Sequence, residues 1–150
     1  MWFRKKKPNP SDVIRGLRQQ ALTVTSAELG LRPDGPDDVW GVVMETGYAE
    51  AVATLVVLAE GTTSLYFSNG GGVIGAGEHA AVREAGKVLL STASTHVREC
   101  APARDTPVAQ IGRVRLYLRT DGGLLGARQV SRSSASGGIR CRQCFTRRMP

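Results

Sequence analysis

Residues 68–79, SNGGGVIGAGEH, separate a segment with strand-like periodicity from one with helix-like periodicity. The stretch holds five glycines. Backbone so rich in glycine suits positive φ angles or very close approach to another group. The sequence therefore predicts a constrained loop that connects a β-sheet to a helix.

Four strands are predicted around this loop. Three precede it, at residues 39–45, 50–59 and 62–68, and the dipeptide Glu60-Gly61 is a hairpin signal between the last two. The strand at 50–59 is apolar on both faces, which places it in the interior of the sheet. Residues 113–119, RVRLYLR, alternate cleanly, so we expect an edge or one-side-solvated strand that exposes its arginines and tyrosine.

Two helices complete the predicted fold. The first helix is predicted at residues 11–26, where Ser11 is a suitable N-cap. The second is predicted at residues 77–98, whose apolar side chains share one face. The element order is α-β-β-β-α-β. We therefore predict the α+β class, with a four-stranded antiparallel sheet and two helices in a single domain at residues 10–121.

Length and charge support one domain with basic ends. A chain of 150 residues has room for one core. The net charge is +7, but residues 1–7 supply four cations, and residues 122–150 supply six arginines without a carboxylate. Residues 8–121 hold ten cations and thirteen carboxylates, so the basicity is no argument for a nucleic-acid-binding core.

The two ends are predicted to lie outside the domain. Residues 1–9 read as a basic flexible N-terminus. Residues 122–150 show no periodicity and carry almost no large apolar side chains, so we predict a disordered basic tail.

The segments VWGVVMETG at residues 39–47 and YFSNGGGVIG at residues 66–75 resemble a group of uncharacterised bacterial proteins. The resemblance extends from residue 38 to about residue 119; it implies a shared fold and transfers no known activity. The tail departs from the pattern of that group. Residues 137–150, back-translated and read in another frame, are similar to the ending of the group, which suggests the hypothesis that residues after about Gly123 come from a shifted frame.

The glycine-rich loop is the candidate contact site of the protein. Gly70, Gly72 and Gly75 match the G-x-G-x-x-G spacing of dinucleotide-binding proteins, but hairpins precede them and no parallel strand with an acidic end follows. We therefore interpret the loop as a structural turn or a surface for a partner, with nucleotide binding as the alternative. The predicted contact residues are Asn69, Gly70, Gly71, Gly72, Gly75, Gly77, Glu78 and His79.

Catalytic and metal chemistry find little support in the sequence. Glu78 and His79 could form a proton-transfer pair, but a carboxylate in a first helical turn also complements the helix dipole. Cys141 and Cys144 form half a zinc site that His96 and Cys100 could complete, yet about 40 residues separate the halves, far from the usual short ligand spacing. We predict no catalytic residue, no metal and no cofactor.

The predicted function is that of a small, non-enzymatic binding or accessory protein, with another protein as the partner. The chain has three cysteines, an odd number that does not suit a framework of paired disulfides. It favours reduced thiols in a cytoplasm. One alternative is a ligand- or nucleotide-binding enzyme that uses residues 70–79. The other is a peripheral membrane or nucleic-acid binder that uses its basic ends, because Trp2 and Phe3 precede four cations as in membrane anchors.

Overall fold

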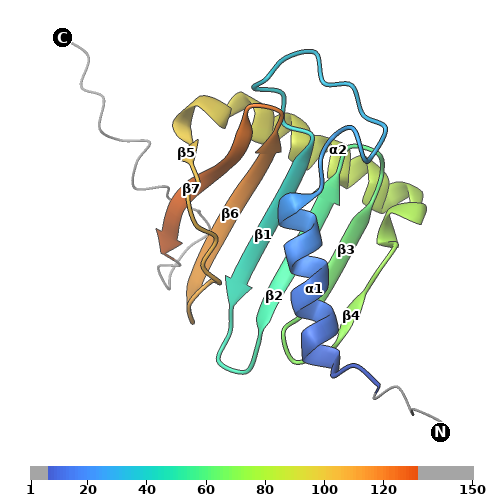
Figure 1. The fold of residues 1–150 in the computed structure, drawn as a ribbon, viewed down its shortest axis with the longest axis vertical. Helices are drawn as coiled ribbons and strands as arrows, with labels where there is room; N and C mark the ends of the chain where they lie inside the picture. Colours follow the sequence, from blue (N-terminus) through green and yellow to red (C-terminus); the bar gives the residue numbers. More distant parts are fainter. Residues whose placement is uncertain (1–6, 132–150) are drawn as a thin grey trace, which may run out of the picture.

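The computed structural model describes residues 7–131, in which a β-sheet lies between two helices (Figure 1). Helix α1, Pro10–Thr23, covers one face, and helix α2, Ala80–Thr95, covers the other. The predicted α+β class with two helices is confirmed. The short 3₁₀ helices η1, Ala76–Glu78, and η2, Val97–Glu99, flank α2, so the helix predicted at residues 77–98 is interrupted at both ends.

The prediction of four strands is wrong, because the sheet of the described residues has seven. Their order is β4-β3-β2-β1-β6-β7-β5, and all neighbours are antiparallel. The strands are β1 Gly41–Gly47, β2 Val52–Leu58, β3 Thr63–Phe67, β4 Gly72–Val73, β5 Ala101–Pro102, β6 Arg113–Thr120 and β7 Gly123–Ser131. Strands β4 and β5 have two residues each, too few for periodicity to reveal them.

Strand β7 lies in the segment predicted to be disordered from residue 122. It forms a hairpin with β6, and its two leucines pack on opposite faces: Leu124 on the α1 side and Leu125 on the α2 side. Those two side chains and the ladder to β6, which has a β-bulge between Val114 and Leu116, hold this glycine-rich strand in the sheet. The rest of the predicted tail, residues 132–150, and residues 1–6 lie outside the described residues.

Strand β1 divides the core into two halves. Val43 faces α1 and packs with Ala21, Leu22 and Tyr66, whereas Val42 faces α2 and packs with Ala93. Both valines are fully buried. This alternation across a strand covered on both sides fixes which side chains lie beneath α1.

Strand β6 is not the solvated strand that its alternation predicted. It lies between β1 and β7, and its residues Tyr117 and Arg119 are buried on the α1 side. The Arg119 guanidinium donates to the backbone carbonyls of Leu22 and Val24 at the end of α1. It also lies 4.9 Å from the centre of the Trp40 ring, a cation–π distance. The charge of Arg119 is thus accommodated by carbonyl dipoles and an aromatic face, and burial lowers its pKa.

Helix α1 begins one residue before the predicted start. Asn9 is the N-cap in place of Ser11, and its side chain accepts a hydrogen bond from the Ser11 backbone N–H at 3.2 Å. Pro10 occupies the first helical position, where its missing N–H costs nothing. The chain before α1 therefore enters the helix through Pro8, Asn9 and Pro10, and Pro10 lies close to Gly70.

Candidate functional site

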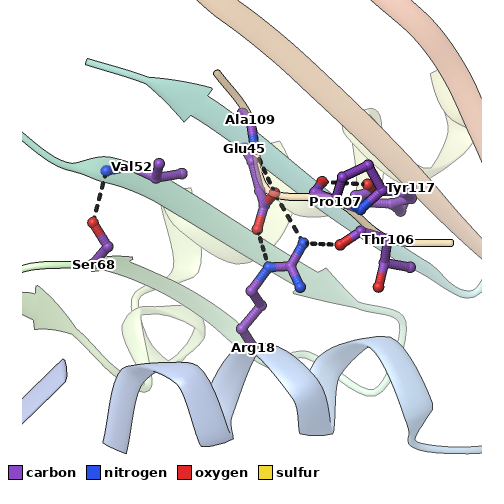
Figure 2. A network of polar contacts seen from close by, with 8 residues as sticks. All are labelled: Arg18, Glu45, Val52, Ser68, Thr106, Pro107, Ala109 and Tyr117. Carbon is purple, nitrogen blue, oxygen red and sulfur yellow. Dashed lines mark hydrogen bonds and ion pairs between the residues drawn. The ribbon is translucent and has the colours of Figure 1, made fainter. Parts of the chain in front are cut away.

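The predicted contact loop forms two separate structures. Asn69, Gly70 and Gly71 make the tight turn between β3 and β4, where the Phe67 backbone N–H donates to the Gly71 carbonyl at 2.8 Å. Beside it, the Val52 backbone N–H donates to the Ser68 hydroxyl at 2.9 Å (Figure 2). Residues 75–79 instead belong to η1 and the start of α2. We call residues 68–72 the glycine turn.

The glycine turn forms one wall of an apolar groove of about 310 Å³, and the first half of α1 forms the other. Every lining residue except Tyr66 has an apolar side chain or none. The groove is open to solvent, because Val13 is 44% exposed and Ile74 69% exposed at its rim. The lining residues are Pro8, Pro10, Val13, Ile14, Leu17, Tyr66, Gly70, Gly71, Gly72 and Ile74.

Gly70 allows the turn to approach α1. Its φ angle is 109°, and a Cβ atom there would lie only 2.7 Å from the Pro10 Cβ. A Cβ on Gly71 would meet nothing closer than the Phe67 ring at 3.8 Å. The two neighbouring glycines therefore differ, and only the first is needed for this contact.

We expect Gly70→Ala to destabilise the protein by about 1 to 3 kcal/mol, because alanine resists a positive φ and would collide with Pro10. Gly71→Ala is the matched control and should change the free energy of unfolding by less than about 0.5 kcal/mol. Urea unfolding followed by circular dichroism measures both. Equal stability of the two variants would contradict the contact between the turn and α1.

The second half of the predicted loop has a structural role. Gly77 is buried where η1 crosses the β2–β3 hairpin, and a Cβ there would lie 1.9 Å from the Gly61 carbonyl oxygen. Glu78 and His79 are exposed and do not line the groove. The structure thus places Asn69 to Gly72 beside the groove and separates Gly75, Gly77, Glu78 and His79 from it.

A buried ion pair lies between α1 and the sheet (Figure 2). Arg18 of α1 donates from Nε to the Glu45 Oε1, and from Nη2 to Oε2 at 3.2 Å. The Glu45 side chain is fully buried in β1. Leu17, which precedes Arg18 in α1, lines the groove, so this pair anchors the helix that forms one groove wall.

The segment at residues 106–109 completes the polar network. Arg18 Nη2 donates to the Thr106 carbonyl at 2.8 Å, and the Ala109 backbone N–H donates to Glu45 Oε2 at 3.3 Å. The Tyr117 hydroxyl of β6 donates to the Pro107 carbonyl at 2.8 Å. Elements far apart in the sequence are thereby joined around one carboxylate (Figure 2).

The charges of this network are stabilised by each other. Burial lowers the pKa of Arg18, but the hydrogen bond and charge of Glu45 more than offset it, so the pKa lies above its ordinary value. Burial, and after it the negative charge of Glu45, raises the pKa of Tyr66 to about 12. Tyr66 therefore keeps its proton near neutral pH and brings a neutral hydroxyl-bearing side chain to the groove.

Sequence reasoning found the glycine turn but missed the α1 wall and the ion pair. The signals existed in α1: Ile14, Leu17, Arg18 and Ala21 share one helical face, which places a cation on the side that packs against the sheet. Glu45 likewise follows a run of apolar strand residues. A carboxylate and an arginine that both point into a core predict an ion pair.

Comparisons of the chain with protein-family models, with curated proteins and with solved structures gave no match. Within residues 7–131 no helix is long and apolar enough to cross a bilayer. Cys141 and Cys144, the half zinc site noted in the sequence, lie outside the described residues. Among the residues that the structure does describe, no three metal-binding side chains gather.

Proposed function

We propose that this protein is a small, non-enzymatic accessory protein that binds an apolar segment of a partner protein in the groove between α1 and the glycine turn. The apolar lining of that groove carries the proposal. It is built by the turn that the sequence singles out, and it lies on the surface of a well-packed sheet. The cytoplasmic setting is part of the proposal and rests on the cysteine content alone.

The lining chemistry favours binding over catalysis. General acid–base catalysis works best with a group whose pKa lies near the operating pH. Tyr66, with a pKa of about 12, is the one lining residue that titrates. Glu78 and His79 do not line the groove.

Nucleotide binding is less favoured, because the strands on both sides of the glycine turn are antiparallel, whereas the dinucleotide motif joins parallel strands.

The open shape of the groove favours a macromolecule over a small ligand. Small-molecule pockets bury most of the ligand surface. This groove instead continues onto the exposed side chains of Val13 and Ile74. Clustered exposed apolar side chains of this kind mark protein–protein contact sites.

Selection from a library of short, displayed random peptides tests the proposal. We expect the full chain to enrich peptides that contain two or more large apolar residues. Ile74→Asp should weaken their binding at least about tenfold, equivalent to about 1.4 kcal/mol, because it brings a carboxylate to the apolar rim. Fluorescence anisotropy of the enriched peptides measures the dissociation constants.

Val88→Asp is the matched control. Val88 is 66% exposed on α2, across the sheet from the groove, so the same change should leave peptide binding intact. Failure to enrich any peptide, or binding that Ile74→Asp does not weaken, would overturn the proposal. A saturable thermal shift with ATP, GTP, NAD or FAD would favour the enzyme alternative.

A further inference from the structure

Asn69 and Gly70 place an asparagine directly before a glycine in the glycine turn. Asn69 is exposed, and among the described residues no hydrogen bond to its side chain is found. Gly70 has no side chain to shield its backbone nitrogen, and glycine adopts a wider range of backbone conformations than other residues. The Asn69 amide group is therefore open to attack by the backbone nitrogen that follows it.

Asn9 provides an internal comparison. The chain has two asparagines, and both are exposed. Asn9 precedes Pro10, whose nitrogen carries no hydrogen. As the N-cap of α1, its side chain also accepts a hydrogen bond from the Ser11 backbone N–H at 3.2 Å. A reaction through the following backbone nitrogen is thus open to Asn69 and closed to Asn9.

We propose that Asn69 is a site of spontaneous deamidation through a cyclic imide. The Gly70 backbone nitrogen attacks the side-chain Cγ of Asn69, and a C–N bond forms there. The bond from Cγ to the side-chain nitrogen breaks, and ammonia leaves with the proton that Gly70 has lost. Water then opens the imide at either carbonyl, which leaves aspartate or isoaspartate. No electrons are exchanged, and water is the co-reactant.

One hydrogen bond must open before the imide can form. The Gly70 backbone N–H donates to the Phe67 carbonyl at 2.9 Å. This hydrogen bond lies within the turn, where Ser68 and Asn69 are exposed. Local opening of an exposed turn costs much less free energy than opening the core of a sheet, so the folded protein reaches the reactive conformation.

Isoaspartate changes the turn more than aspartate does. It carries the main chain through the former side chain, which adds an atom to the backbone between residues 69 and 70. The Phe67 backbone N–H closes this turn by donating to the Gly71 carbonyl, and Gly70 lies close to Pro10 of α1. The added atom displaces both contacts. Because Gly70 and Gly71 line the groove, one of its walls changes too.

Ageing of the folded full chain in mildly alkaline buffer at physiological temperature tests the proposal. Cleavage after glutamate releases residues 61–78, which contain Asn69 but no other side-chain amide and no aspartate. Mass spectrometry of this fragment therefore reports deamidation of Asn69 directly, and electron-transfer fragmentation separates isoaspartate from aspartate. We expect both products to accumulate at Asn69, while Asn9 in the fragment of residues 1–28 keeps its amide.

Two variants separate this modification from other damage. Asn69→Gln keeps a side-chain amide but closes the larger ring much more slowly, so it should age without loss of the amide or of stability. Unaged Asn69→Asp has the new charge without the added backbone atom. We expect the aged parent to unfold at a lower urea concentration than both the unaged parent and unaged Asn69→Asp.

Each step of the proposal has an outcome that would overturn it. Asn69 might keep its amide in the folded chain for as long as the urea-unfolded chain needs to lose it, which would mean that the turn protects it. Equal loss at Asn9 would show that Gly70 takes no part, and aspartate without isoaspartate would show direct hydrolysis in place of an imide. Unchanged urea unfolding of the isoaspartate-containing protein would contradict the effect on the turn.

Discussion

Replacing Val56 with aspartate is expected to abolish cooperative folding. Val56 is 3% exposed in β2, pairs with the fully buried Val43 of β1, and belongs to the core beneath α1. A carboxyl group there is either ionised without a partner or protonated without adequate hydrogen bonds. Either state costs several kcal/mol against a total stability of about 5 to 15 kcal/mol.

Thermal unfolding followed by circular dichroism, with one-dimensional proton NMR as a test of packing, measures this effect. Val88→Asp makes the same change on the exposed face of α2 and should melt within a few degrees of the parent. A soluble Val56→Asp protein with a cooperative transition would contradict the location of the core between α1 and the sheet.

The elements that the sequence predicts correctly are those with a local signal. Both helices and strands β1, β2, β3 and β6 show periodicity over five residues or more. Strand β7 lacks that signal, because glycines separate its few apolar residues, and it is ordered by its ladder to β6. Hydrogen bonds to a neighbouring strand leave no mark on composition.

Alternation in β6 reveals two different faces but not what covers them. Arg119 and Tyr117 are covered by α1 and by the segment around Pro107, and 97 positions separate Arg119 from Leu22 of α1. A strand with arginines on one face therefore resembles a solvated strand until the helix packed on it is known. Burial of Arg119 depends on acceptors that only the tertiary structure brings to it.

In the candidate site too, local sequence signals reveal some features, whereas others depend on tertiary packing. Glycine composition locates the turn, yet it cannot distinguish Gly70, which contacts Pro10, from Gly71, which has space for a side chain. The wall formed by α1 and the pair between Arg18 and Glu45, 27 residues apart, require the helix to be placed on the sheet.

Replacing Glu45 with alanine is expected to destabilise the protein by about 3 to 5 kcal/mol, because it leaves a largely buried guanidinium without its counter-ion. The Arg18 side chain is 14% exposed, and the Thr106 carbonyl alone would remain as its acceptor in this network. The Ala109 backbone N–H would lose its acceptor too. Urea unfolding gives the change in the free energy of unfolding. Asp12→Ala breaks an exposed pair and should cost at most about 1 kcal/mol.

A double variant separates charge from packing at this site. Arg18→Met combined with Glu45→Leu removes both charges and keeps most of the volume, so its stability should lie within about 1 to 2 kcal/mol of the parent and above that of Glu45→Ala. Since α1 forms a groove wall, the double variant should also retain binding of the apolar peptides that the full chain enriches. If the double variant is as unstable as Glu45→Ala, the unpaired arginine is not the cause of the loss. The cause is then the network itself, which holds α1 and residues 106–109 to the sheet.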